Sequence, residues 1–271
     1  MSREIAILID GGFLTKRLAK LVAEPDRLTP HAMCGVIRSM CRAHVQKLTD
    51  DKSSNWHRHV YRIFYYDAPP FEGQAHHPLS GRQINFKKSD QAIFQNELFA
   101  LLRKQRNMAL RLGHLSNFSG WTVDHGRVTK LLRVKGALTE LAALPRAEDG
   151  TITLSVELAE QMQAHAAHWT ALEDWMVRLD LRQKGVDMRI GLDIASITLK
   201  RQASTIILVA GDADFVPAAK LARREGVQFI LDPLWQSVSN DLFEHIDGLQ
   251  TVLKRPEKKE AVAKNQNEGN Q

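Results

Sequence analysis

The chain has few of the features that mark secreted, membrane-spanning or nucleotide-binding proteins. It contains only two cysteines, Cys34 and Cys41, which a helix would place about 10 Å apart, too far for a disulfide. No apolar run approaches the ~20 residues of a membrane span, and no signal sequence precedes the first apolar run. Glycine-rich dinucleotide-binding motifs, Walker loops and Gly-x-Ser-x-Gly elbows are also missing. We therefore expect a cytoplasmic protein with reduced thiols and no membrane partner.

The charge that the chain does carry is unevenly distributed. Its net charge is +6, yet residues 82–135 hold eleven lysines and arginines against three acidic residues, an excess of +8. Residues 184–247 hold seven basic and nine acidic residues, a balance of −2. A basic flank beside an acidic pocket suits a metal-dependent enzyme that acts on a polyanion. Arg103, Lys104 and Arg106 are the candidate substrate-binding residues; the alternative is that the basic helices are merely solvated surface.

Four apolar runs each end at an aspartate. The runs are residues 5–9, 60–66, 206–210 and 227–231. The aspartates that follow them are Asp10, Asp67, Asp212 and Asp232, and only Asp212 is separated from its run by one residue, Gly211. Continuous runs of this kind are typical of strands buried on both faces of a parallel sheet. Ligands bind such sheets just outside the carboxyl ends of the strands. Carboxylates gathered there require a cation between them, and oxygen-only ligands favour Mg²⁺ or Mn²⁺ over zinc.

The remaining elements follow from helical spacing, caps and turn residues. We expect strands at residues 4–10, 59–66, 109–112 and 121–123 and from residues 205 and 227. We expect helices from residue 14, after Thr29-Pro30, at residues 89–106, 129–144 and 156–177, and from residues 187, 215 and 239. This alternation predicts an α/β sandwich with a mostly parallel sheet.

Several acidic residues are candidates for the site. Asp10 precedes two glycines that allow close approach of a ligand, and Asp212 and Asp214 flank Ala213 directly after a predicted strand. Asp187 opens a predicted helix, where it could also serve as a cap alone. Asp193 lies six positions further, which turns it away from Asp187 on an unbroken helix. We expect Asp193 to act indirectly, and turn formation explains Asp67 and Asp232 about as well as function does.

Four motifs in order resemble those of the NYN domain family, which belongs to the PIN-like nucleases and includes LabA-type proteins. They are Ile9-Asp10-Gly11-Gly12-Phe13, Phe64-Tyr65-Tyr66-Asp67-Ala68-Pro69, Lys184-Gly185-Val186-Asp187 with Asp193, and Gly211-Asp212-Ala213-Asp214-Phe215-Val216-Pro217. The resemblance implies a PIN-like three-layer α/β/α sandwich with a helical insertion. It also implies RNA as the substrate and an Mg²⁺ or Mn²⁺ site formed by Asp10, Asp187, Asp212 and Asp214, with Asp193 and Lys184 as weaker candidates. Phe13 departs from the family pattern, in which many members have asparagine.

This resemblance predicts one domain at residues 1–253, with a basic insertion around residues 117–180 and a disordered charged tail at 254–271. The leading functional hypothesis is a metal-dependent endoribonuclease that hydrolyses RNA phosphodiester bonds. Two alternatives stay open: a non-catalytic RNA-binding or regulatory protein on the same fold, and a metal-dependent phosphatase of another α/β class. Gly12 stands where phosphatases with a nucleophilic aspartate have a second acid, which disfavours the latter. A homodimer also stays open.

Overall fold

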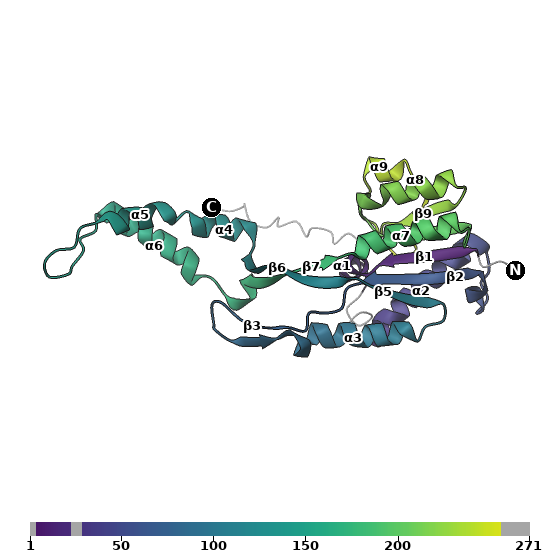
Figure 1. Ribbon diagram of the computed structural model, residues 1–271, viewed down its shortest axis with the longest axis horizontal. Helices are drawn as coiled ribbons and strands as arrows, with labels where there is room; N and C mark the ends of the chain where they lie inside the picture. The colour runs from purple at the N-terminus through teal and green to yellow at the C-terminus, as the bar shows by residue number, and fades with distance from the viewer. Residues whose placement is uncertain (1–3, 23–28, 256–271) are drawn as a thin grey trace, which may run out of the picture. The chain divides into compact units, whose positions relative to one another are not determined.

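A computed structural model describes residues 4–22 and 29–255, and the chain divides into two compact units (Figure 1). The first unit comprises residues 1–70, 90–114 and 183–271, and the second comprises residues 71–89 and 115–182. The segment expected to be an insertion, around residues 117–180, therefore falls within the second unit. From residue 256 onward, the tail predicted at 254–271 lies outside the described residues.

The first unit is built around a six-stranded sheet with the strand order β10-β9-β8-β1-β2-β5. All five strand pairs are parallel, as the apolar runs predicted. The strands are β1 (Ile5–Asp10), β2 (Val60–Asp67), β5 (Met108–Leu112), β8 (Thr205–Val209), β9 (Gln228–Asp232) and β10 (Gly248–Leu249).

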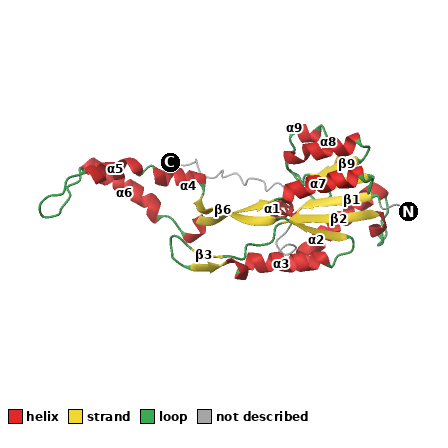
Figure 2. Ribbon diagram, in the orientation of Figure 1, coloured by secondary structure: helices red, strands yellow, loops and turns green. Residues whose placement is uncertain are grey.

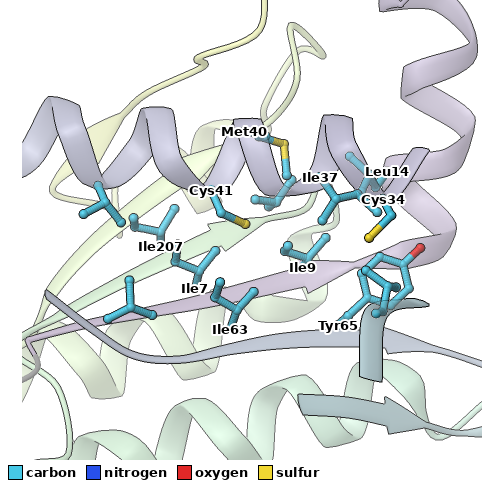
Figure 3. Close-up of a cluster of buried hydrophobic side chains, with 14 of the residues drawn as sticks. Ile7, Ile9, Leu14, Cys34, Ile37, Met40, Cys41, Ile63, Tyr65 and Ile207 are labelled. Atoms are coloured by element: carbon cyan, nitrogen blue, oxygen red, sulfur yellow. The ribbon is translucent and has the colours of Figure 1, made fainter. Parts of the chain in front are cut away.

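Helices cover both faces of this sheet, because alternate side chains of each buried strand point to opposite sides. Ile7 and Ile9 face a core with α1 (Gly11–Leu21), α2 (Pro30–Thr49) and α3 (Asp90–Arg103), whereas Ala6 and Leu8 face α7 (Val186–Leu199), α8 (Val216–Arg224) and α9 (Asn240–Phe243). Figure 3 shows part of the first core, where α2 lies over β1. The predicted three-layer α/β/α sandwich is thus confirmed.

The two cysteines belong to the first of these cores. Cys34 and Cys41 are free and buried on α2, and burial raises the pKa of the Cys41 thiol to about 12. The sequence predicted small buried side chains rather than a disulfide, and this is confirmed. Burial keeps the Cys41 thiol protonated and therefore unreactive.

The second unit contains a hairpin of β3 (Gln74–His76) and β4 (Gln83–Asn85), which the sequence analysis missed. It also holds three helices, α4 (His125–Leu132), α5 (Lys135–Ala143) and α6 (Val156–Thr170), drawn in red in Figure 2. A two-stranded sheet of β6 (His114–Val123) and β7 (Val177–Lys184) lies mostly within this unit. Short 3₁₀ turns lie at Trp56–His59, Phe86–Lys88, Asp174–Met176 and Ala213–Phe215.

Several predicted boundaries were wrong. The helix expected at residues 129–144 is two helices, α4 and α5, and the one expected at 156–177 ends at Thr170. The helix expected at 89–106 ends at Arg103. Val177, Leu179 and Leu181 alternate with polar residues, which is the pattern of a strand, and β7 occupies this segment. Across the ranges 4–22 and 29–255, the structure has no helix long and apolar enough to cross a bilayer.

Candidate active site

The connections of the sheet create a crevice at the carboxyl ends of β1 and β8. From β1 the chain passes to β2 and β5 on one side, and it later returns to β8, β9 and β10 on the other. The neighbours β1 and β8 therefore flank the point where the strand order reverses, which is the usual ligand site of such sheets. Asp10 is the last residue of β1, and Asp212 follows β8 by three positions.

A cavity of about 530 Å³ opens at this crevice. Three of the predicted acids, Asp10, Asp187 and Asp212, line it together. The other lining residues come from α1, the end of β7, the start of α7 and the segments after β8 and β9. They are Gly12, Phe13, Lys16, Gln183, Val186, Gly211, Ala213, Gln236, Ser237 and Ser239. Asp10 thus shares one polar cavity with two carboxylates that lie more than 170 positions further along the chain.

The carboxylates differ in their local bonding. Asp10 caps α1, where its Oδ1 accepts a hydrogen bond of 2.9 Å from the backbone N–H of Phe13. Asp212 likewise accepts from the N–H of Asp214 at 3.1 Å. Asp187 was expected to open its helix, but the N-cap of α7 is Gly185, with φ 76°. Asp187 lies in the first turn, exposed, and its carboxylate accepts no hydrogen bond from the described residues, which leaves it free for a ligand.

These carboxylates repel one another. Burial raises the pKa of Asp10, and the negative charge of Asp187 raises it further. The pKa of Asp187 is also raised, first by partial burial and then by the charges of Asp212 and Asp214. Lys16 lowers the pKa of Asp10 and is the one cation acting on it among the described residues. A positive charge placed among these acids would relieve the repulsion.

Asp214 faces an adjoining surface. Together with Asp187 it lines a second, wider cavity between α7 and α8, with Met188, Gly191 and Pro217. Asp187 contributes to both cavities and so stands between Asp214 and the pair formed by Asp10 and Asp212. The four acids thus form a row across two adjoining cavities.

Phe13, which departs from the family pattern, has a specific place in this site. A Cβ atom on Gly211 would lie 2.5 Å from Cε2 of Phe13 and 2.7 Å from Nε2 of Gln236. The Phe13 ring therefore packs on the backbone of Gly211, and any larger residue at position 211 would force the Phe13 ring to shift. Gln236 brings an amide group to the same point, so a polar group reaches the cavity from the loop after β9.

That loop is held in place from two sides. Leu234 is buried and adopts φ 48°, and its carbonyl oxygen accepts hydrogen bonds of 3.0 and 2.5 Å from Nε and Nη2 of Arg17. Asp232 accepts from the N–H of Leu234 at 2.9 Å and lies 2.8 Å from Nε2 of His44. Because Asp232 and His44 are fully buried, Asp232 shapes the loop and does not line the cavity.

Asp67 and its partner Gln183 were not identified as site residues from the sequence. Asp67 is buried, and its Oδ1 accepts hydrogen bonds from the N–H of Ala68 at 2.7 Å and from Nε2 of Gln183 at 2.8 Å. A smaller cavity of about 270 Å³ is lined by Asp67, Gln183, Gly12 and Lys16, and the last three also line the main cavity. The motif around Asp67 was a signal, but Gln183 lies on β7, the strand that the sequence analysis missed.

Asp67 should make stability depend on pH. Burial raises its pKa from 3.8 to about 6, so proton uptake favours the folded state. The stabilisation by the proton is full below pH 3.8 and is lost as the pH rises through about 6. Asp67→Asn should therefore stabilise the fold at pH 8 by up to about 3 kcal/mol, and this gain should fall to roughly half at pH 5. Urea unfolding at both pH values measures it, and equal gains at the two values would contradict the assignment.

Asp193 makes a structural contact and does not line the cavity. Its carboxylate accepts a hydrogen bond of 2.8 Å from the Tyr66 hydroxyl and two from Arg111, at 2.9 Å from Nε and 2.5 Å from Nη2. These bonds tie α7 to β2 and β5. Because α7 also carries Asp187, Asp193 fixes the position of that carboxylate indirectly.

Asp193→Asn should weaken this contact without removing a group from the cavity. We expect a loss of about 1 kcal/mol of stability, since the Arg111 side chain is 44% exposed and the pair is screened. Activity should fall less than in Asp187→Asn at the same metal concentration, because only Asp187 lines the cavity. Melting curves and cleavage rates of both variants provide the measurement. An equal loss of activity with an unchanged melting temperature would show that Asp193 acts directly.

The structure does not bring the basic candidates to this cavity. Arg103, Lys104 and Arg106 precede β5, whose first residue pairs near the amino end of β2. The acids lie at the carboxyl ends, beyond the length of β5, which is roughly 15 Å for five residues. Lys184 is exposed at the end of β7 and is not among the residues that line the cavity. The +8 segment is itself divided between the two units.

The spacing of the acidic side chains limits how a metal ion can be bound at this site. Within the described part of the chain, no group of three or more histidine, cysteine, aspartate or glutamate side chains is close enough together to hold a metal ion directly. The acids share a cavity without forming a closed set of ligands. Their donor type and mutual repulsion suit a hard cation that keeps part of its water shell, as Mg²⁺ does.

Comparison with known families agrees with this geometry. The NYN domain model matches residues 114–247. This segment is an NYN domain. The NYN domain is a PIN-like, nuclease-type fold, and the matched region carries Asp187, Asp193, Asp212 and Asp214, while Asp10 lies before it. Searches against curated proteins and against solved structures gave no match.

Proposed function

We propose that this NYN protein is a ribonuclease that uses a divalent cation, Mg²⁺ or Mn²⁺, to hydrolyse RNA phosphodiester bonds. The observation that carries the proposal is the convergence of Asp10, Asp187 and Asp212 on one cavity at the carboxyl ends of the neighbouring strands β1 and β8. The family adds that its fold is of the nuclease type.

In this proposal Asp10, Asp187 and Asp212 would hold the cation partly through its water shell, with Asp214 beside them. When bound, the ion supplies a more acidic water and neutralises the charge that develops on the phosphate. The Asp10 carboxylate is kept in one orientation by the Phe13 N–H. Lys16, which is exposed on the cavity wall, is placed to contact a substrate phosphate.

The amide and hydroxyl groups of the cavity orient the substrate. Gln183 is anchored through Asp67, and the loop that carries Gln236 and Ser237 is fixed by Arg17. Such groups can donate to phosphate or sugar oxygens without reading the base. The expected specificity of the cavity is therefore for the RNA backbone, and any sequence preference arises elsewhere.

The non-catalytic alternative is supported by one observation, the absence of a closed ligand group among the described residues. Incubation of the purified protein with labelled single-stranded RNA, in Mg²⁺, in Mn²⁺ and in EDTA, separates the two. Cleavage that requires the cation supports the ribonuclease, and RNA binding without cleavage under all three conditions supports the alternative. Hydrolysis of a phosphomonoester in place of RNA would instead indicate a phosphatase.

A further inference from the structure

The second unit has a cavity of its own, lined mainly by groups that carry or can carry positive charge. It measures about 220 Å³ and lies between α4, the end of α6 and the turn that follows. Its polar side chains are those of Arg127, Lys130 and His168, and Leu131, Leu172 and Met176 provide apolar contacts. Among the residues that the structure describes, no acidic side chain lines it. A cavity of this size is smaller than typical ligand sites, and it suits one part of a larger ligand.

Arg127, Lys130 and His168 differ in whether an acidic side chain already pairs with them. Arg127 pairs with the Asp124 carboxylate, which also caps α4 by accepting from the Arg127 N–H at 3.1 Å. Lys130 is exposed and pairs with no acidic residue in the described ranges. His168, near the end of α6, also has no acidic partner there. Lys130 and His168 are therefore available to an anion, and the Asp124 pair fixes Arg127 beside them.

An exposed aromatic ring adjoins these cations. The guanidinium carbon of Arg127 lies 5.5 Å from the centre of the Trp175 ring, within the range of a cation–π contact. The indole N–H of Trp175 donates to the Glu173 carboxylate, which orients the ring. Trp175 nevertheless remains 64% exposed. The exposed ring of Trp175 is therefore available to stack on an unpaired base.

A cationic cavity beside an exposed aromatic ring is the combination that binds single-stranded nucleic acid. We propose that this cavity is a second RNA-binding site, in which Lys130, His168 and Arg127 bind a phosphate and an unpaired base stacks on Trp175. The proposal deepens the proposed ribonuclease function and rests on RNA being its substrate. Because Asp124 already engages Arg127, Lys130 should contribute most of the salt dependence of the site.

The test uses the full chain carrying Asp10→Asn, in EDTA, so that RNA is bound without cleavage. Fluorescence anisotropy with a labelled twelve-nucleotide single strand gives the affinity at several salt concentrations. Trp175→Ala should weaken binding by roughly 5- to 100-fold, the contribution of one stacked base, and Trp175→Phe should retain most of the affinity. Lys130→Glu should weaken binding. It should also make the negative slope of log K against log salt less steep by about one.

Two matched controls belong to the same unit. Trp169→Ala removes another tryptophan that is 50% exposed, and Lys135→Glu reverses an exposed lysine on α5; neither residue lines the cavity. Both should bind RNA as the parent does. If the Trp175 and Lys130 variants behave like these controls, the second site is wrong even where cation-dependent cleavage stands.

The other outcomes are also distinguishable. If the protein with Asp10 intact cleaves no RNA, and Trp175→Ala still abolishes RNA binding, the second site is supported and the ribonuclease proposal is refuted. A parent protein that neither binds nor cleaves RNA would overturn both proposals. Displacement of RNA by a polyglutamate peptide, with Trp175-dependent binding of that peptide, would show that the cavity takes an acidic protein segment instead.

Discussion

Asp10→Asn should reduce RNA cleavage by at least about 100-fold, the usual cost of removing a group that stabilises charge at a reacting centre. The carboxylate lies at the end of β1 and lines the main cavity with Asp187 and Asp212. Asparagine keeps the size of the side chain and the oxygen that accepts from the Phe13 N–H, and it caps a helix as well as aspartate does. The change therefore removes the charge and little else.

The same substitution separates catalysis from folding. Because burial and Asp187 raise the pKa of Asp10, the folded protein is stabilised by protonation below pH 3.8, and this gain is lost as the pH rises through the raised pKa. At pH 7.5, without a divalent ion, Asp10→Asn should thus melt at the same temperature as the parent or higher. In Mn²⁺, the parent should gain more thermal stability than the variant.

Asp50→Asn is the matched control for this experiment. Asp50 is exposed at the end of α2 with φ 54°, a conformation that asparagine tolerates, and it does not line the cavity. Cleavage rates at several Mn²⁺ concentrations should separate the two variants. A parent-like rate in Asp10→Asn, or an equal fall in Asp50→Asn, would remove Asp10 from the site.

The sheet and its acidic end were predictable because their signals are local. A strand buried on both faces must be apolar throughout, so β1, β2, β8 and β9 appear as continuous runs, and each run ends near a polar residue. The parallel arrangement then places those ends at one edge. The direction of Asp193 also followed from helix geometry, and its bonds with Tyr66 and Arg111 agree with an indirect role.

The contacts around that end were not predictable, because they join distant segments that no local rule connects. Gln183 reaches Asp67 across 116 positions, and Phe13 packs on Gly211 because their strands are neighbours. The basic segment is the converse case. Its charges are adjacent in the sequence, but the fold separates Arg103 from the cavity and assigns Arg111 to Asp193. An excess of positive charge in one stretch of sequence therefore does not show that those side chains form one binding surface in the fold.

Gly11→Ala should destabilise the fold by about 1–3 kcal/mol, the range for overpacking a core. Gly11 is buried at the start of α1, where an added Cβ would lie 2.7 Å from two atoms of the Tyr65 ring and 2.7 Å from the carbonyl oxygen of Tyr66. The Tyr65 ring is fully buried, and the carbonyl belongs to β2, so neither can move freely. A melting temperature lower by roughly 2–12 °C is the expected result.

Gly35→Ala makes the same chemical change at a position with space. Gly35 is exposed within α2, and an added Cβ there would meet nothing within 4 Å. Alanine should therefore stabilise the helix by about 0.5–1 kcal/mol through backbone entropy and helix propensity. Because Asp10 immediately precedes Gly11, the displaced turn should also lower the cleavage rate of Gly11→Ala, whereas Gly35→Ala should cleave RNA as the parent does. If the two variants melted at the same temperature, the close packing of the β1–α1 turn on Tyr65 would be wrong.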